Sequence, residues 1–521
     1  MKPRRWLDLG ALLVLALIVR LLTAWLLRQP GYTDAYYYAV GAQQLHAGQG
    51  FTEPFIWNYL DPPASLPHPG YLYWMPLTAM LGWLGLEILG ESFRAIQAPF
   101  VLVSALLPLM AYTVTWDLTG RRKHALLAGA LAVFVGFYAH VFVLPDNFAP
   151  FALGGSLCLW AAGRGLRNGQ VTWFGLAGVA AGVAHLARAD GALLLGVTWL
   201  AATAAKRLPT RAKATGIASS LAGYLLVMGP WFVRNWQAVG TPLAGAGFKT
   251  LFLTTYDDIF GYQPPLNLKS YLAWGWGAIL QSKAEALWLN LQRLWAENLL
   301  IFLLPLTAMG LWVHRRERLI QPFLLYLPLL FVAMTFAFTF PGSRGGLFHS
   351  GGALLPFFFA AAGPGLDAML RWAARRFPGW QADKAWSVFS VGAVAMAVLV
   401  TLLALARAGV LDGDWNKRDW GYAEIGQWLD DQGAAEATVM VGNAPGFTWH
   451  TGHPAIAVPN EPLDTVLSVA DDYAVRYLLL DSTRPRFTDA LYDGQINHPQ
   501  LVRQHIPQLE GQAWQLYKIL P

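Results

Sequence analysis

The sequence predicts a polytopic α-helical membrane protein with a long first outer loop and a small α/β domain at its C-terminus. The 521 residues are 55% hydrophobic and 14% aromatic but only 13% charged. The mean hydropathy is +0.38, which is too apolar for an ordinary soluble domain. Apolar runs of spanning length recur up to residue 407, and after residue 408 they shorten to strand length while Asp, Glu and Gln become frequent.

About eleven apolar runs are candidates for membrane-spanning helices, which need about 20 residues each. The first run follows a basic start and carries no A-x-A-like cleavage site, so it is predicted to be a retained helix and not a signal peptide. The predicted spans lie near residues 7–28, 96–116, 124–144, 148–163, 171–187, 191–205, 215–233, 298–314, 320–340, 352–370 and 385–407.

Basic clusters occupy alternate connections between these helices, as the positive-inside rule requires of cytoplasmic connections. One side receives MKPRR, GRRKH, GRGLRNG, KRLPTRAK, HRRER and RWAARRFPGWQADK. The other side receives residues 29–95, 145–147, 188–190, 234–297, 341–351 and everything after 408. The formal charge of +6 therefore reflects topology and does not indicate nucleic acid binding.

This pattern predicts a multi-pass protein with a cytoplasmic N-terminus and an extracytoplasmic C-terminal domain. The outer loops contain no Asn-x-Ser/Thr sequon, which suits the plasma (inner) membrane of a bacterium. We divide the chain into a membrane module, 1–407, and an outer α/β domain, 408–521. In the second part, strand-length runs such as ATVMVGN and VRYLLLD alternate with helical periodicity in WGYAEIGQWLDDQG and PLDTVLSVADDY.

One apolar segment, YLYWMPLTAMLGWLGLEIL at residues 71–89, is predicted not to span the membrane. Counting it as a span would move GRRKH to the outer side, against the positive-inside rule. Its Trp and Tyr content suits an amphipathic or half-buried helix in the outer interface. The first outer loop, 29–95, is therefore predicted to carry interfacial helices.

The loop opens with GYTDAYYYAVGAQQLHAGQGF, which places Asp34 and three tyrosines directly after the first helix. Asp34 is either the N-cap of the following helix or a general base at the membrane surface. The remainder of the loop is longer than a connector needs. Its candidate substrate-binding side chains are Tyr36, Tyr37, Glu53, Trp57, Asp61, His68 and Tyr71.

Three further outer segments carry cationic side chains near the interface. HLARADG interrupts a helical hairpin, where a self-satisfied Arg/Asp pair is an equally simple interpretation. The arginine in PWFVRNW stands on the outer side, against the inside bias of basic residues. Because the guanidinium fork suits phosphate, these segments together are predicted to bind a phosphate or diphosphate headgroup. The candidates are Arg188, Asp190, Arg234, Asn235, Arg344 and His349.

The order of these motifs resembles the GT-C membrane glycosyltransferases. The similarity is to the lipid-phosphate-sugar-dependent branch that includes protein O-mannosyltransferases and aminoarabinose transferases, the family 39-like group. It rests on the acid followed by tyrosines, on LPHPGYLYWMPL, on RAIQAPF and on PWFVRNW followed by GTP, and it extends over residues 1 to about 370.

The resemblance implies inverting transfer of a sugar from a polyprenyl-phosphate donor to an extracytoplasmic acceptor, with Asp34 as the base and tyrosines stacking on sugar faces. The family usually has Asp-Glu at the start of this loop. Here the second position is Ala35, so Glu53 or Asp61 is a candidate for the missing carboxylate. His68, in PHPG where the family often has Lys-Pro-Pro, would be a cation only when protonated.

The resemblance also implies that no cofactor is required, and a divalent metal ion, which some GT-C enzymes use, is not indicated. The expected partners are the lipid-linked donor, the bilayer and an acceptor that is a protein, a glycan, a lipid or another small molecule. A lipid-linked sugar transporter or flippase is the alternative, and a non-catalytic receptor or assembly protein is a third. A transporter predicts mid-helix ionisable residues and short connections on both sides, whereas here the outer connections are long and polar.

Overall fold

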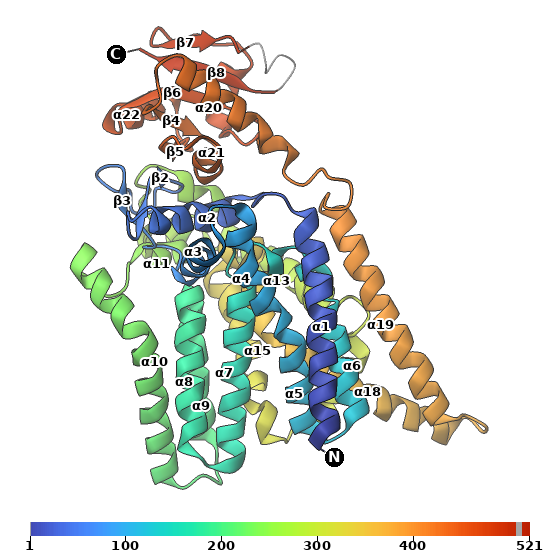
Figure 1. Ribbon diagram of the computed structural model, residues 1–521. Coiled ribbons are helices and arrows are strands. Elements are labelled where there is room, and N and C mark those ends of the chain that lie inside the picture. Colours follow the sequence, from blue (N-terminus) through green and yellow to red (C-terminus); the bar gives the residue numbers. More distant parts are fainter. Residues whose placement is uncertain (1, 507–512, 521) are drawn as a thin grey trace.

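The structure, a computed structural model, describes residues 2–506 and 513–520 and consists of a helical bundle beneath a smaller α/β part (Figure 1). All eleven predicted spans are helical over at least part of their length. The bundle helices are α1 Lys2–Leu26, α4 Phe93–Ala105, α5 Leu107–Thr119, α6 Arg122–Val133, α7 Phe148–Asn168, α8 Val171–Ala187, α9 Ala192–Ala204, α10 Thr210–Val239, α14 Leu304–His314, α15 Gln321–Val332, α18 Leu355–Arg376 and α19 Ala382–Arg407.

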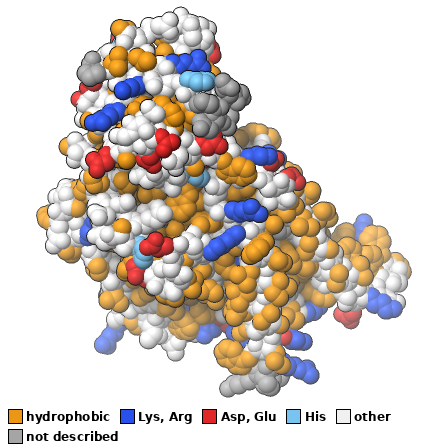
Figure 2. All heavy atoms as spheres, turned by 45° about the horizontal axis from the view of Figure 1, so that its top comes forward, with side chains coloured by type: hydrophobic (Ala, Val, Ile, Leu, Met, Phe, Trp, Pro, Cys, Tyr) orange, Lys and Arg blue, Asp and Glu red, His pale blue; other side chains and the backbone are white. Residues whose placement is uncertain are grey.

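Among the described residues, six helices are long and apolar enough to cross a membrane, or seven if the bent pair Arg122–Val133 and Gly136–Val143 is one span. This number is lower than eleven because several predicted spans are short or broken. The run near 298–314, for example, is α-helical only from Leu304. Figure 2 shows apolar side chains spread over the helical part of the surface, and several large ones such as Trp25 and Leu226 are exposed. The protein is a multi-pass membrane protein.

The connections predicted to share the basic side lie together at one end of the bundle. Arg122, the first residue of α6, pairs with Asp8 of α1 at 2.6 Å. Lys123 pairs with Asp367 of α18 at 2.9 Å, and Arg318 donates to the carbonyl of Leu166 at the end of α7. These contacts agree with the alternation of connections that the basic clusters predict.

The first outer loop lies across the opposite end of the bundle (Figure 1). Its helix α3 has 13 residues, too few to span a bilayer, and exposes Ile88 and Leu89, as the predicted interfacial helix should. Gly41 of α2 is required by packing, because a Cβ there would overlap the Tyr71 hydroxyl. The loop elements are α2 Thr33–His46, β1 Thr52–Glu53, β2 Phe55–Ile56, β3 His68–Pro69 and α3 Leu77–Leu89.

A second outer segment, between α10 and α14, adds α11 Ala246–Lys249, α12 Leu268–Ala273 and α13 Trp276–Arg293. Between α15 and α18 the chain forms two short helices, α16 Thr339–Pro341 and α17 Leu347–Gly351, around the glycine-rich turn 342–346. This turn carries Arg344, and α17 carries His349.

The α/β part contains a six-stranded sheet in the order β2-β5-β4-β6-β8-β7. The pairs β2–β5, β5–β4 and β4–β6 are parallel, and β6–β8 and β8–β7 are antiparallel. Its elements after residue 408 are α20 Gly421–Asp431, β4 Thr438–Val441, α21 Ala444–Thr451, β5 Ala455–Ala457, α22 Leu463–Asp472, β6 Val475–Leu480, α23 Asp489–Tyr492, β7 Leu501–Gln504 and β8 Gln515–Ile519.

One edge strand of this sheet comes from the first outer loop. Phe55 and Ile56 of β2 pair with Ala455 and Ile456 of β5, and the Tyr473 hydroxyl donates to the carbonyl of Pro63 at 2.5 Å. The predicted α/β domain therefore shares its sheet with the membrane module across the proposed boundary at residue 408.

Candidate functional site

The candidate site begins at the first turn of α2, where Asp34 is the second helical residue. Tyr32 occupies the N-cap position, so the predicted alternative that Asp34 caps the helix is wrong. A carboxylate in the first turn is stabilised by the positive end of the helix dipole. Asp34 is thereby fixed at the outer end of the bundle, directly after the first span.

A second carboxylate, Asp146, lies beside Asp34. Oxygen atoms of Asp34 and Asp146 and a ring nitrogen of His349 lie within 4.8 Å of one another. The Tyr32 hydroxyl donates to Asp146 Oδ2 at 2.6 Å, and the Asn147 backbone N–H donates to Asp146 Oδ1 at 2.5 Å. The carboxylate beside Asp34 is thus Asp146, a residue outside the predicted set, and neither Glu53 nor Asp61.

His349 is oriented by Asn147 and by an aromatic ring. Its Nδ1–H donates to Asn147 Oδ1 at 2.8 Å, and its ring stacks on Phe148 with centroids 3.7 Å apart. The Nε2 atom then faces Asp34, with 4.0 Å between Nε2 and Oδ2. One ring nitrogen is therefore engaged with the scaffold, and the other is directed at the acid pair.

Arg188, at the turn between α8 and α9, supplies positive charge to the cluster. Its Nε donates to Asp190 Oδ1 at 3.0 Å, as expected for the predicted self-satisfied Arg/Asp pair. A second nitrogen lies 3.4 Å from Asn147 Oδ1, and the Ser350 hydroxyl donates to Asp190. The pair is therefore also part of a network that extends to the acid cluster.

Burial raises the pKa of Asp34, whereas the charges of Arg188 and Arg344 lower it. Burial also raises the pKa of Asp146, and the neighbouring charge of Asp34 raises it further. Like charges so close disfavour ionisation of both groups. For Asp34, burial outweighs the two arginine charges and raises the pKa to about 6, which suits a general base near neutral pH.

Arg344 approaches Asp34 from the glycine-rich turn. Its guanidinium carbon lies 4.3 Å from the ring centroid of Tyr256. Arg293 of α13, which was not among the predicted residues, holds this turn by donating to the carbonyls of Ser343 at 2.9 Å and Arg344 at 3.0 Å. The turn thus presents a cationic side chain from a backbone that is itself anchored.

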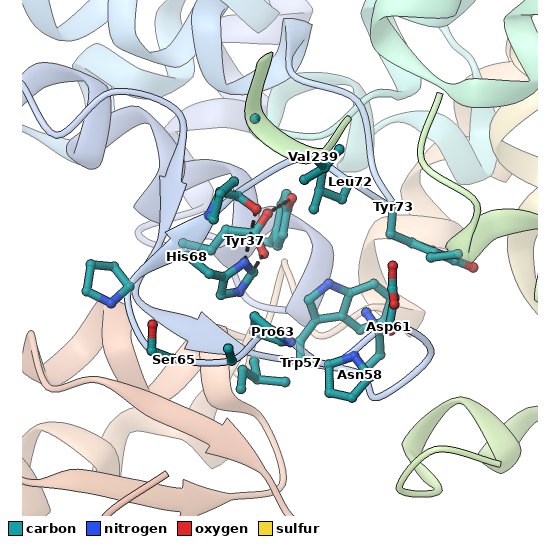
Figure 3. Close-up of a pocket in the computed structure, with 18 residues that line it drawn as sticks. Tyr37, Trp57, Asn58, Asp61, Pro63, Ser65, His68, Leu72, Tyr73 and Val239 are labelled. Atoms are coloured by element: carbon teal, nitrogen blue, oxygen red, sulfur yellow. Dashed lines mark hydrogen bonds and ion pairs between the residues drawn. The ribbon is translucent and has the colours of Figure 1, made fainter. Parts of the chain in front are cut away.

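A second group forms around Glu53 within the first outer loop. Its Oε1 accepts hydrogen bonds from the Tyr37 hydroxyl and, at 2.6 Å, from the Tyr71 backbone N–H. His68 lies 3.7 Å away, between Nε2 and Oε2. Figure 3 shows Tyr37 and His68 together at one wall of a pocket that Trp57 and Asp61 also line. Burial raises the pKa of Glu53, and the charge of His68 lowers it.

Arg234 belongs to this second group and not to the acid cluster. Its guanidinium donates to the carbonyls of Gly70 and Phe51 at 2.9 and 2.8 Å and lies over the Trp231 ring. Asn235 accepts from Arg234 at 3.0 Å. The structure therefore divides the predicted phosphate-binding set. His349 lies 4.0 Å from Asp34, and the charges of Arg188 and Arg344 act on it. Asp190 holds Arg188, while Arg234 and Asn235 support the first loop.

Tyr36 points toward the α/β part and away from Asp34. Its hydroxyl lies 3.1 Å from His450 Nε2 and accepts a hydrogen bond from the Asn416 side chain. Nearby, Gly31 has a φ of 92°, and a Cβ at this position would overlap Trp415. The start of α2 is therefore clamped by residues that follow the last membrane helix.

Sequence reasoning missed Asp146, Asn147, Ser350 and Arg293. Asp146 had one available signal, since VLPDNF places an acid in the three-residue outer connection 145–147. Asp34, Asp146 and His349 also have the composition of a divalent cation site, with two carboxylates and an imidazole whose second nitrogen is engaged by Asn147.

Comparison with known proteins identifies similar folds. Residues 67–233 match the family model of dolichyl-phosphate-mannose-protein mannosyltransferase, a region that includes Asp146 and Arg188 but not Asp34. No curated protein is similar in sequence to this chain.

Among solved structures, ArnT from Cupriavidus metallidurans, bound to undecaprenyl phosphate, is 14% identical with a TM-score of 0.60, and the alignment covers 98% of this chain and 97% of ArnT. The archaeal oligosaccharyltransferase AglB from Archaeoglobus fulgidus, in complex with an inhibitory peptide and a dolichol-phosphate, is 13% identical with a TM-score of 0.56, over 92% of this chain and 69% of AglB. The predicted resemblance is therefore confirmed: the chain has the fold of the GT-C membrane glycosyltransferases.

Proposed function

We propose that this protein is a glycosyltransferase that moves a sugar from a polyprenyl-phosphate donor to an acceptor on the extracytoplasmic face of a bacterial plasma membrane. The observation that carries the proposal is the cluster at the outer end of the bundle, in which Asp34, Asp146 and His349 lie within 4.8 Å of one another and the charges of Arg188 and Arg344 act on Asp34. The lipid phosphates in the ArnT and AglB structures support a donor of the same class.

The cluster supplies the groups that an inverting transfer needs. Asp34 takes the proton from an acceptor hydroxyl or amine. The resulting nucleophile attacks the anomeric carbon, the bond from that carbon to the phosphate oxygen breaks, and the polyprenyl phosphate leaves with the electron pair. Arg344 stabilises the charge on the departing phosphate. Donor-dependent sugar transfer by the purified protein tests this function.

The donor can reach this site because its lipid tail remains in the bilayer. Asp34 follows α1 directly, and α3, with exposed Ile88 and Leu89, lies at the same end of the bundle. A water-soluble or lipid-bound acceptor meets such a donor only at the interface. The cluster therefore lies where a lipid-linked donor and its acceptor can meet.

Arg344→Ala is expected to weaken donor binding by roughly tenfold or more, because a hydrogen bond to a charged group contributes about 1.5–3 kcal/mol. The measurement is the Kd for polyprenyl phosphate by isothermal titration in detergent. Arg407→Ala, at an exposed arginine of α19, is the matched control. Equal donor affinity in Arg344→Ala and the control would move the phosphate site elsewhere.

We further propose that no divalent metal is required, because Arg188 and Arg344 already place positive charge beside Asp34. Transfer is expected to persist after dialysis against EDTA, measured with the same donor and acceptor before and after treatment. Loss of transfer with EDTA and its recovery with Mg²⁺ or Mn²⁺ would contradict this. It would make Asp34, Asp146 and His349 the metal ligands.

A further inference from the structure

A separate pocket of about 370 Å³ lies between the first outer loop and the outer end of α10. Its walls come mainly from residues 53–73 of the loop, and Val239 of α10 closes one side (Figure 3). The six side chains that matter for its chemistry are Glu53, Trp57, Asn58, Asp61, His68 and Tyr73.

The aromatic walls of this pocket are rigid. Trp57 stacks on Trp74 with ring centroids 4.1 Å apart and planes 15° apart, and it meets Tyr73 edge to face at 5.2 Å. Because Trp57 is only 7% exposed, its ring is held by its neighbours. Preformed aromatic surfaces of this kind bind the apolar faces of a ring without a large ordering cost.

The polar side chains of the pocket offer both hydrogen-bond acceptors and donors. The Asp61 carboxylate has no hydrogen bond or ion pair within the described part of the chain. Asn58 Oδ1 accepts from the Leu60 backbone N–H at 3.1 Å, which leaves its amide N–H groups for a ligand. Glu53 and His68 close the opposite wall and are engaged with each other and with the loop.

These groups disfavour a phosphate. Of the described residues that line the pocket, two are carboxylates and none is a lysine or an arginine. An anion placed here would meet the buried carboxylate of Glu53 and the exposed carboxylate of Asp61, and like charges repel most strongly where they are shielded from water. The cationic side chains beside the loop are engaged with its backbone, since Arg234 donates to the carbonyl of Gly70 and Lys249 donates to the carbonyl of Leu60.

The pocket and the acid cluster are adjacent. Tyr37 lines the pocket and lies three residues after Asp34 in α2, on the same face of the helix. Tyr73 lines it too, and the charges of Arg188 and Asp34 both act on the Tyr73 phenol, whose pKa is raised mainly by burial. One wall residue of the pocket is therefore a single helical turn from the proposed base.

We infer that this pocket is the acceptor subsite and that it binds a hydroxyl-rich, phosphate-free ring, a neutral sugar or an amino sugar. The inference rests on the proposed function, because only a transferase has an acceptor. Trp57 and Tyr73 contact the ring faces, and Asp61 and Asn58 bind its hydroxyl groups. The acceptor class is thereby narrowed to a glycan or a glycolipid.

Binding without turnover tests the assignment. The probes are methyl α-D-mannoside, methyl N-acetyl-β-D-glucosaminide and glucosamine. Their binding to the full chain in detergent is measured by saturation-transfer NMR. We expect a signal from at least one probe with wild type and with Asp412→Asn, an exposed acid beyond α19. Asp61→Asn or Asn58→Ala should weaken binding about fivefold, the effect of one hydrogen bond of about 1 kcal/mol.

Further measurements in the same experiment distinguish a failure of this inference from a failure of the proposed function. Undecaprenyl phosphate at saturation should not displace the bound probe. Displacement would assign the pocket to the donor sugar, and the absence of signal from every probe, or equal signals in both variants and wild type, would overturn the inference. Because the assay requires no transfer, a bound probe with no detectable sugar transfer would contradict the proposed function and leave the carbohydrate site intact.

Discussion

Asp34→Asn is expected to lower the rate of sugar transfer by about 10²–10⁴-fold, the contribution typical of a positioned general base. The amide keeps the size and shape of the carboxylate but cannot accept the acceptor's proton. The measurement is kcat with a radiolabelled lipid-linked sugar, together with the Kd for polyprenyl phosphate. Donor affinity should change little, because the cations remain in place.

The fold should survive this substitution. Asp34 lies beside Asp146, whose pKa is raised by burial and by the charge of Asp34, so removing one negative charge relieves repulsion in the cluster. Asp412→Asn is the control for a lost carboxylate outside the site. Transfer within a few-fold of wild type in the folded Asp34→Asn protein would remove Asp34 as the base.

Arg188→Gln is expected to shift the acid limb of the pH–rate profile to higher pH. The positive charge of Arg188 lowers the pKa of both Asp34 and Asp146, so its removal raises both values. At a pH below the new pKa, the fraction of ionised base falls about tenfold for each unit of the shift. Activity should therefore fall at pH values below the new pKa and recover as the pH rises above it.

Glutamine is chosen because its amide can still donate a hydrogen bond at the α8–α9 turn, where Arg188 donates to Asp190. A merely structural defect would lower the rate at every pH. Arg407→Gln is the control for loss of a surface charge. A pH–rate profile of Arg188→Gln that parallels the wild-type profile would show that Arg188 does not tune the base.

The sequence was most informative where burial alone determines structure. Spanning helices and the strands β4, β5 and β6 are runs of apolar residues, and their composition reports their surroundings directly. The basic residues also predicted which connections lie together, and the contact of Arg122 with Asp8 brings two of the predicted basic segments to one end of the bundle. The strand β2 was not readable, since its two residues are too few to show a period.

The site was harder to predict, because its pairings depend on tertiary packing. Asp34 and Asp146 are far apart in the chain. They meet only when the short connection that precedes α7 packs beneath α2. Glu53 is nearer in sequence to Asp34, but the β1–β3 pairing directs it toward Tyr71 and His68. The outer position of Arg234 was predicted. Its guanidinium, however, donates to two backbone carbonyls, and no pattern of side chains in the sequence indicates such contacts.

The pocket and the contacts that hold Tyr36 also depend on tertiary packing. The α/β part contributes β5 beside β2 and His450 beside Tyr36, so the loop that carries Asp34 is held from both sides. A composition-based boundary at residue 408 separates two segments that the fold joins. Variants that truncate the chain at this point would therefore alter the loop as well.

The decisive experiment is transfer from radiolabelled polyprenyl-phosphate mannose, glucose or arabinose, with purified protein in detergent and a crude membrane extract as acceptor. We expect label from at least one donor to move from the lipid to the acceptor with inverted anomeric configuration, and Asp34→Asn to lower this transfer by about 10²–10⁴-fold. The contrary result is no transfer from any of the three donors while the reconstituted protein moves the lipid-linked sugar across a bilayer, which would make it a flippase.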